Sequence, residues 1–330
     1  MDPAIHVPLA LSPPSMRPAP TQSAGVTHLK HLINNYLSNL EFDRPGTHHG
    51  MAYAIEKGVE SHFVSLPLEK GMCFPVRPVF EVAATFAHQA YTGLSLELQI
   101  QCAILLAYMF IVDDIARCSM KGLDSFGQKF FDQRDHADYI LNGLDGHIRG
   151  LSNHYGPSCY SQITQGLIAY VNGCVMAEAN AKSSAQNSQS SLMPAYLQSK
   201  DGGAEVLIHL LWPKDIFPSD KSPFSYSEVT PRLMRFVNYS KHILSYYREG
   251  IRGPEQRNFV DDWAKLRGLS SLEILEQFAN GGVKAMKEID ALPLDPLIVE
   301  RVQIFTKGWI MLGIAHREYH LVELFQDEYL

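Results

Sequence analysis

The 330-residue sequence lacks an excess of positive charge, because 28 Lys and Arg residues stand against 35 Asp and Glu and give a net charge of −7. No basic cluster relieves this acidity, so binding to nucleic acid or to an anionic membrane is not expected. The longest uninterrupted apolar run, Cys102 to Val112, is far too short to span a membrane. The first residues also lack the basic region of a secretory signal. We therefore expect a soluble, cytoplasmic protein without membrane insertion.

Cysteine is scarce, odd in number and never spaced as Cys-x-x-Cys, which argues against a disulfide framework and against a zinc ribbon. We expect reduced thiols at all of these positions. The five cysteines are Cys73, Cys102, Cys118, Cys159 and Cys174.

Strand signals are missing as well, since no alternation is sustained and no Asn-Gly or Asp-Gly turn separates two alternating runs. Helical periodicity takes their place over most of the chain. The segments predicted as helical are 26–40, about 50–64, 79–91, 95–117, 124–149, 160–182, 229–250, 270–288 and 295–327. With 46% apolar residues, the chain can bury a sizeable core. We predict a leader over residues 1–25, which is rich in Pro, Ser and Ala, and one all-α domain of roughly ten helices over residues 26–330.

One helix ends in paired acids. Residues 98–112 have almost no polar face, which is typical of a buried helix, and they lead directly into Asp113 and Asp114. Two carboxylates near a helix C-terminus add to the negative end of the helix dipole, so a nearby cation would stabilise them. A hard divalent ion such as Mg²⁺ is one such cation, and an ordinary ion pair with Arg117 is the alternative.

A second helix carries Lys241, Ser245 and Glu249 at intervals of four residues, so that they share one face. A hydroxyl and a carboxylate one turn apart can bind one hard cation from a single helix. The alternative is a solvated stripe of polar side chains without a ligand.

In combination, these features resemble the class I terpene synthases, and in particular the fungal trichodiene-synthase-like sesquiterpene cyclases. Asp113-Asp114 matches the first metal motif of that family, and Ser245 and Glu249 match the last two ligands of the second. Further local similarities, in the same order and spacing over roughly residues 90–325, are Tyr155–Cys159, Gly173-Cys174 with Glu178, Leu211–Phe217 and Glu318–Leu321.

The resemblance implies a class I terpenoid-synthase helical bundle around a central cavity. It implies two or three Mg²⁺ ions at Asp113, Asp114, Ser245 and Glu249. It also implies farnesyl diphosphate as the substrate, and a cyclic sesquiterpene hydrocarbon and diphosphate as the products. Homodimers are common in the resembled family. The catalytic candidates are Asp113, Lys241, Arg248 and Tyr319, and the further candidates for diphosphate contacts are Gln198, Lys200 and Arg317.

The sequence departs from the family pattern at several charged positions. Arg117 stands where an acid is usual, and Lys241 stands where the metal-binding Asn is usual. Gln198 and Glu318 replace two arginines, and no arginine occurs between Arg149 and Arg232. We hypothesise that the Lys241 ammonium supplies positive charge where a metal ion normally sits.

A cyclase also needs a dry pocket with aromatic faces that stabilise a carbocation. The residues expected to form its wall are Phe86, Met109, Phe110, Asn238 and Leu312, with Leu105, Leu106, Tyr108, Met234, Val237 and Trp309 near them. Aliphatic and sulfur-containing side chains near the acids suggest an open, smooth cavity that fits a farnesyl chain. We therefore predict α-humulene, formed by closure between the ends of the chain.

Three other functions stay open. A prenyltransferase or prenyl-diphosphate enzyme on the same fold would need a second acidic site, and only a loose cluster of Glu288, Asp290 and Asp295 is present. An inactive helical protein that binds isoprenoids would explain the lost cationic positions. His316 and His320 are spaced to bind zinc, although no His-Glu-x-x-His motif accompanies them.

Overall fold

The computed structural model describes residues 24–42, 49–64, 66, 76–118, 122–183, 193–218, 226–252, 258–315 and 319–325. Within these ranges the ordered elements are helices, and the β contact is one isolated bridge between Thr92 and Leu94. The predicted all-α class is confirmed for this part of the chain. Most of the predicted leader lies outside the described residues, so the leader stays a prediction.

The helices follow one another along the chain without intervening strands. They are α1 (Ala24–Asn39), α2 (His49–Phe63), α3 (Arg77–Ala90), α4 (Leu96–Cys118), α5 (Phe126–Asp132), α6 (Tyr139–Gly150), η1 (Leu151–Asn153), α7 (Pro157–Ser183), α8 (Met193–Lys200), α9 (Gly203–His209), α10 (Thr230–Tyr246), η2 (Tyr247–Arg252), α11 (Phe259–Arg267), α12 (Ser271–Asp290), α13 (Pro296–Ala315) and α14 (Leu321–Phe325).

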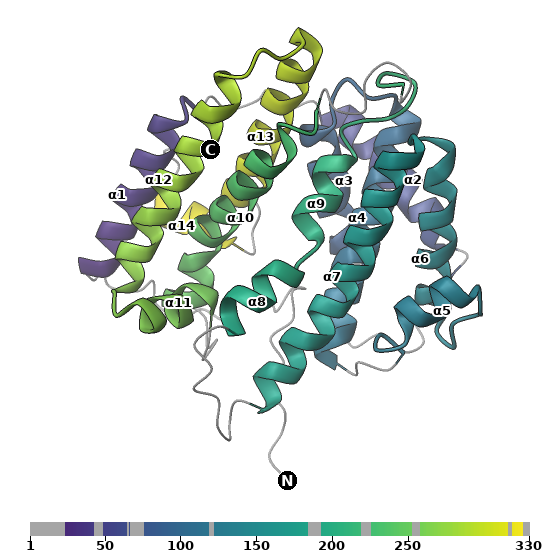
Figure 1. The fold of residues 1–330 in the computed structure, drawn as a ribbon, viewed down its shortest axis with the longest axis horizontal. Coiled ribbons are helices and arrows are strands. Elements are labelled where there is room, and N and C mark those ends of the chain that lie inside the picture. The colour runs from purple at the N-terminus through teal and green to yellow at the C-terminus, as the bar shows by residue number, and fades with distance from the viewer. Residues whose placement is uncertain are drawn as a thin grey trace.

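The helices form two groups, which are visible side by side in Figure 1. One group contains α1, α10, α12, α13 and α14, and the other contains α2 to α7 with α9. The groups are joined where α13 packs against α3 and α10 packs against α9. The cavity discussed below is lined by helices of both groups.

Helix α4 is the central helix of its group and packs against α2, α3, α6 and α7. Leu105, Ala107, Ile111 and Val112 are fully buried, as expected for a helix without a polar face. Among the described residues it is the one helix long and apolar enough to cross a membrane, but 72% of its apolar window is buried inside the protein. It is therefore a core helix.

The turn between α3 and α4 is fixed by a buried arginine. Gly93 has a φ of 90°, a conformation that favours glycine, and Arg301 of α13 donates to its carbonyl oxygen at 2.8 Å. Two turns further along α13, a Cβ at Gly308 would lie 2.6 Å from the backbone nitrogen of Ala90. The backbones of α3 and α13 are therefore in direct contact at this crossing.

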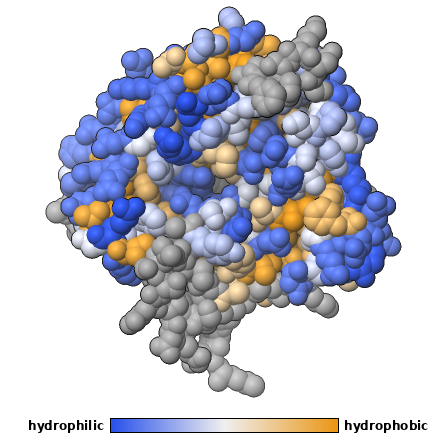
Figure 2. Space-filling view, in the orientation of Figure 1, coloured by the Kyte–Doolittle hydropathy of each residue, from blue (hydrophilic) through white to orange (hydrophobic). Residues whose placement is uncertain are grey.

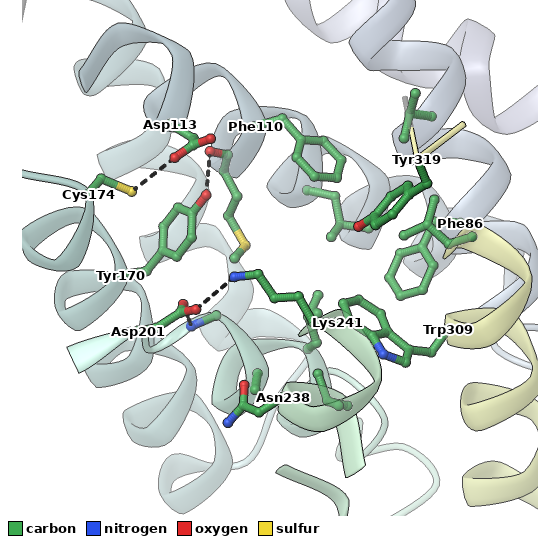
Figure 3. Close-up of a pocket in the computed structure, with 18 of the residues that line it drawn as sticks. Phe86, Phe110, Asp113, Tyr170, Cys174, Asp201, Asn238, Lys241, Trp309 and Tyr319 are labelled. Atoms are coloured by element: carbon green, nitrogen blue, oxygen red, sulfur yellow. Dashed lines mark hydrogen bonds and ion pairs between the residues drawn. The ribbon is translucent and has the colours of Figure 1, made fainter. Parts of the chain in front are cut away.

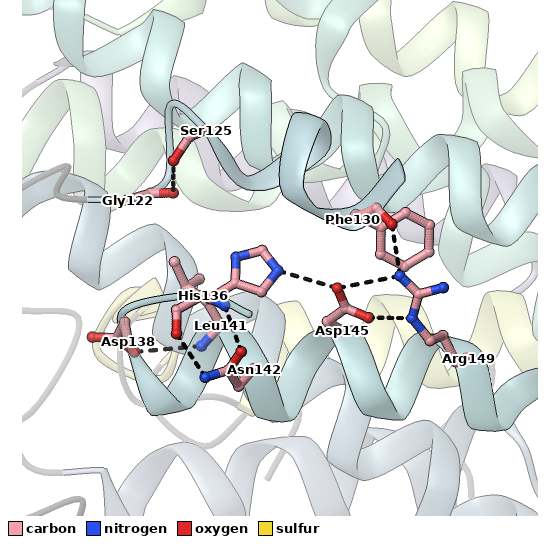
Figure 4. A network of polar contacts seen from close by, with 9 residues as sticks. All are labelled: Gly122, Ser125, Phe130, His136, Asp138, Leu141, Asn142, Asp145 and Arg149. Atoms are coloured by element: carbon pink, nitrogen blue, oxygen red, sulfur yellow. Dashed lines mark hydrogen bonds and ion pairs between the residues drawn. The ribbon is translucent and has the colours of Figure 1, made fainter. Parts of the chain in front are cut away.

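The predicted helix over residues 124–149 is wrong as a single element, because the structure divides it into α5 and α6 (Figure 4). Helix α5 ends at Asp132 and is followed by the cap residue Gln133, which has a left-handed φ of 54°. Helix α6 begins at Tyr139 after the N-cap residue Asp138, whose carboxylate accepts the backbone N–H of Ile140 at 2.7 Å. The loop between them is held by His136, whose ring lies 3.1 Å from the Asp145 carboxylate.

Two other predicted segments also differ from the structure. The segment 229–250 changes from α-helix to π-helix at Tyr247. The segment 295–327 is interrupted at His320, which has a left-handed φ of 56°, directly before α14 begins. Helices α8, α9 and α11 were not predicted, because with seven to nine residues each they are too short to show clear periodicity.

The expectation of five reduced thiols is wrong at Cys118, which is in a disulfide. The described cysteines Cys102, Cys159 and Cys174 are free. Sequence spacing gave no signal for the disulfide, because pairing of cysteines depends on their proximity in the fold and not on their separation in the chain.

The surface has no single dominant apolar face in the view of Figure 2, where hydrophilic residues prevail and hydrophobic ones form separate patches. The large hydrophobic side chains that are exposed among the described residues are Met51, Tyr53, Val64, Leu96, Phe131 and Tyr196.

Candidate active site

A cavity of about 600 Å³ lies between the two helix groups. It is lined by residues of α3, α4 and α7 on one side, of α10 and α13 on the other, and of the α8–α9 region between them. This size is within the range of small-molecule sites. Both charged and aromatic side chains contribute to the lining (Figure 3).

The acidic end of α4 opens into this cavity, where Asp113 and Asp114 are both part of the lining. Asp113 accepts a hydrogen bond from Arg117 at 2.7 Å, so the predicted alternative of an ion pair one turn apart is present. Arg117 itself also lines the cavity. The Sγ of Cys174 on α7 lies 3.9 Å from the other oxygen of Asp113. Burial, followed by the charge of Asp113, raises the pKa of this thiol.

Lys241 projects from α10 into the cavity and donates to Asp201 at 3.0 Å (Figure 3). Asp201 was missed by the sequence analysis, although an Asp before Gly202-Gly203 is a common turn signal. Burial alone would raise the pKa of Asp201, but the charge of Lys241 and its hydrogen bonds outweigh burial and lower it. The charge of Asp201 in turn raises the pKa of Lys241. The two side chains therefore form a charged pair inside the cavity.

The predicted stripe of Lys241, Ser245 and Glu249 is divided between α10 and the π-helix. Lys241 and Glu249 line the cavity, whereas Ser245 is 2% exposed and is not part of the lining. Lys241 and Ser245 are four residues apart in α10 and lie on the same side of that helix, where the Ser245 side chain is packed in the interior. Glu249 follows in the π-helix. The Ser245 hydroxyl has no hydrogen-bond partner in the structure.

Arg248 and Glu249 of the π-helix form an ion pair of 2.8 Å beside the cavity. The guanidinium of Arg248 also lies 5.8 Å from the ring of Tyr319, within the range of a cation–π contact. All three residues line the cavity. Arg248 and Tyr319, which were both predicted as catalytic candidates, therefore lie close together.

The remaining predicted site residues divide into those in the lining and those outside it. The structure places Phe86, Met109, Phe110, Gln198, Asn238 and Leu312 in the lining, together with Leu106, Val237 and Trp309. Lys200 is not in the lining, and its ammonium lies 5.4 Å from the Tyr196 ring. Tyr108 is also outside the lining, and its hydroxyl lies 2.9 Å from His62. Arg317 and His316 lie outside the described residues.

Tyr170 and His242 are two of the lining residues that were not predicted. Tyr170 of α7 donates its hydroxyl to the carbonyl oxygen of Met109 at 3.0 Å, which fixes its ring beside the acidic end of α4. His242 lies next to Lys241, contacts Gln198 at 3.2 Å and stacks on Phe259. Burial and then the charge of Lys241 lower the pKa of His242 to about 4, so it is neutral at pH 7. Neither residue belongs to a sequence motif.

The donor chemistry of the cavity fits Mg²⁺ held jointly by protein and diphosphate. Asp113 and Asp114 supply carboxylate oxygens from α4, and Glu249 supplies one from the π-helix. The described residues contain no group of three His, Cys, Asp or Glu that could hold a metal ion alone. Mg²⁺ usually takes only one or two carboxylates and completes its shell with water and phosphate oxygens, so such a group is not required.

Comparison with known proteins gives the family. The model of the family described as "Trichodiene synthase (TRI5)" matches residues 32–329. The chain belongs to the trichodiene synthase family. It is thus a class I terpene cyclase, an enzyme family of carbon–oxygen lyases that act on prenyl diphosphates and typically use Mg²⁺.

The individual relatives share only low sequence identity with this chain. The (E)-beta farnesene synthase of Metarhizium brunneum is 21% identical over 295 residues, covering 89% of this chain and 88% of that protein. The trichodiene synthase of Trichoderma arundinaceum is 18% identical over 281 residues, covering 84% and 71%. The linalool/nerolidol synthase of Streptomyces clavuligerus shares the fold, with a TM-score of 0.62, 12% identity and coverage of 81% and 95%. The predicted class I terpene synthase fold is therefore confirmed.

Proposed function

We propose that the protein is a sesquiterpene cyclase that converts farnesyl diphosphate into a cyclic C15 product and diphosphate. The observation that carries the proposal is the placement of Asp113 and Glu249 on opposite helix groups around one cavity with aromatic walls. Two fungal relatives, the (E)-beta farnesene and trichodiene synthases, support the C15 chain length by their names.

In this proposal, bound Mg²⁺ supplies the positive charge that stabilises the leaving diphosphate. Asp113, Asp114 and Glu249 would hold the metal, and Ser245 remains a predicted further ligand. Arg248, Lys241 and Tyr319 donate to the diphosphate oxygens, and Gln198 lies close enough to the same region to assist. Lys200 and Arg317 remain predicted contacts.

The reaction begins when the C–O bond of the allylic diphosphate breaks and the electron pair leaves with the diphosphate. The resulting carbocation needs a wall without nucleophiles and with electron-rich faces. Phe86, Phe110 and Trp309 supply such faces, and Met109 and Leu312 supply apolar contacts. Attack by a distal double bond closes the ring, and loss of a proton completes the hydrocarbon.

The product α-humulene remains a prediction of this proposal, as do two or three metal ions, a homodimer and a cytoplasmic location. The runner-up activities are those of a prenyltransferase or other prenyl-diphosphate enzyme and of an inactive isoprenoid-binding protein.

The test is incubation of the purified protein with geranyl, farnesyl and geranylgeranyl diphosphates, with Mg²⁺ or with EDTA, followed by gas chromatography–mass spectrometry. A cyclic C15 product from farnesyl diphosphate that disappears with EDTA supports the proposal, and its spectrum identifies the product. A parallel incubation also contains isopentenyl diphosphate as the C5 acceptor, and a longer prenyl diphosphate formed there, detected as its alcohol after phosphatase treatment, would indicate the prenyltransferase. No product under any of these conditions would indicate the inactive protein.

A further inference from the structure

Asp201 has both carboxylate oxygens engaged at the edge of the cavity. It lies in the short turn between α8 and α9, where one oxygen accepts the backbone N–H of Gly203 at 3.1 Å. The other oxygen accepts the ammonium of Lys241 at 3.0 Å. The carboxylate therefore connects the turn to α10.

The turn itself is fixed against α7 by contacts between backbones. A Cβ at Gly202 would lie only 2.0 Å from the carbonyl oxygen of Gly166, and a Cβ at Gly173 would lie 2.9 Å from that of Lys200. Such distances leave no room for a side chain at either glycine. Asp201 consequently projects from a segment that cannot shift without moving α7.

Lys241 needs such a partner to have a defined position. Its side chain is 45% exposed, and a free lysine has a long stem with several rotatable bonds. An ammonium has three N–H donors, and the bond to Asp201 uses one of them. The other two N–H groups can donate to a second acceptor in the cavity while the hydrogen bond to Asp201 remains.

We propose that Asp201 is a positioning residue of the diphosphate site, which holds the Lys241 ammonium where its other N–H groups donate to a diphosphate oxygen. This inference rests on the proposed function, because it takes the diphosphate group as the ligand. It assigns a role in anion binding to a residue that is itself an anion.

Because Asp201 is negatively charged, the inference can be tested by whether removal of this charge strengthens or weakens anion binding. If only net charge mattered, removal of the carboxylate charge would strengthen binding of an anion to the cavity. If position matters more, the same change weakens binding, because Lys241 then loses the partner that orders its side chain. Asp201→Asn separates the two cases, since asparagine keeps an acceptor for the Gly203 N–H.

The experiment is titration calorimetry of inorganic pyrophosphate at a fixed, saturating Mg²⁺ concentration. We expect Asp201→Asn to weaken pyrophosphate binding roughly tenfold, the size typical of a lost hydrogen bond to a charged group. Thermal unfolding of each variant verifies that the fold is intact. Glu205→Gln is the matched control, because it removes the same charge from α9 at a residue outside the lining, and it should change binding less than about twofold.

The decisive comparison is made in a Lys241→Met background. If Asp201 acts through Lys241, Asp201→Asn has no additional effect there, whereas a purely structural role would weaken binding again. Binding by Asp201→Asn that is as tight as in the wild type, or tighter, overturns the inference. So does an effect of Asp201→Asn that persists undiminished in the Lys241→Met protein.

Failure of this inference can be distinguished from failure of the proposed function, because the readout needs no turnover. A protein without any terpene product that shows the expected binding pattern would refute the cyclase and retain the role of Asp201. An active cyclase in which Asp201→Asn tightens pyrophosphate binding would refute the role of Asp201 alone.

Discussion

Asp113 and Arg117 lie one turn apart on α4 and form an ion pair of 2.7 Å at the edge of the cavity. The side chains are 31% and 39% exposed, so the pair is a partly solvated one. The carboxylate proposed to bind Mg²⁺ is therefore already in contact with a cation of the protein, and metal binding has to compete with that contact.

Arg117→Gln should lower the Mg²⁺ concentration needed for half-maximal activity, because it removes the competing cation. Exposed ion pairs contribute about 0.2–1 kcal/mol, so the expected decrease is roughly 1.5- to 5-fold. The measurement is the Mg²⁺ dependence of product formation from farnesyl diphosphate. Arg134→Gln, which breaks an exposed pair with Asp132 away from the cavity, is the control and should leave this dependence unchanged. A higher Mg²⁺ requirement in Arg117→Gln would contradict the prediction.

Asp113→Asn and Glu249→Gln should each reduce turnover roughly 100-fold or more, since a catalytic metal contributes several kcal/mol to the stabilisation of the transition state. The fold should persist, because neither side chain belongs to the apolar core. Product formation and thermal unfolding are measured on the same samples. Asp132→Asn removes a carboxylate outside the cavity and should keep full activity. Unchanged turnover in both cavity variants would exclude these residues as metal ligands.

His147 should make the protein less stable in mild acid. Burial, followed by the charge of His62, lowers its pKa from 6.5 to about 3, and its Nε2–H donates to the carbonyl oxygen of Gln101 at 3.0 Å. Below pH 6.5 the unfolded state binds a proton that the folded state excludes, so stability is complete above pH 6.5 and falls as the pH decreases toward 3.

At pH 5 this difference corresponds to about 2 kcal/mol of the free energy of unfolding relative to pH 7. Urea unfolding at both pH values measures it in the wild type and in His147→Gln, where the acid-induced loss should be smaller by that amount. His28→Gln alters a histidine with a half-exposed side chain and is the control. An equal acid-induced loss in His147→Gln and the wild type would show that other groups cause it.

Gly202→Ala should destabilise the protein by about 1–3 kcal/mol, because the new methyl group would meet the Gly166 carbonyl oxygen at 2.0 Å. Gly146→Ala is the matched comparison: its Cβ would meet nothing within 4 Å on the exposed face of α6. This second change should stabilise the helix by up to about 1 kcal/mol. Urea unfolding of both variants provides the measurement, and a Gly202→Ala protein as stable as the wild type would contradict the close packing of the turn.

The sequence predicted the long helices well because their periodicity extends over several turns. Helix α4 is the best example, since its apolar face continues all round and leads into Asp113 and Asp114. The division of residues 124–149 was not predicted, because the left-handed conformation of Gln133 and the Asp138 cap depend on a local network of contacts. Helices α8 and α9 were missed because short helices are stabilised by tertiary packing more than by their own pattern.

The candidate site was predicted only where its residues belong to a helical pattern in the sequence. Asp113 and Lys241 stand out in the sequence because they end or interrupt apolar helical patterns, and both lie in the cavity. The role of Ser245 as a metal ligand stays a prediction, because its side chain is buried and lies outside the lining. Asp201 belongs to no pattern, and its role depends on a contact across 40 residues of sequence.

The charged side chains that line the cavity have a consequence for the order in which ligands enter. Five carboxylates, those of Glu81, Asp113, Asp114, Asp201 and Glu249, stand against the three cations Arg117, Lys241 and Arg248. The metal-free cavity thus carries a formal excess of two negative charges, which attracts a dication and repels a polyanion. Electrostatics therefore favours a kinetic sequence in which Mg²⁺ arrives before the prenyl diphosphate or together with it, and free prenyl diphosphate is held back at the entrance.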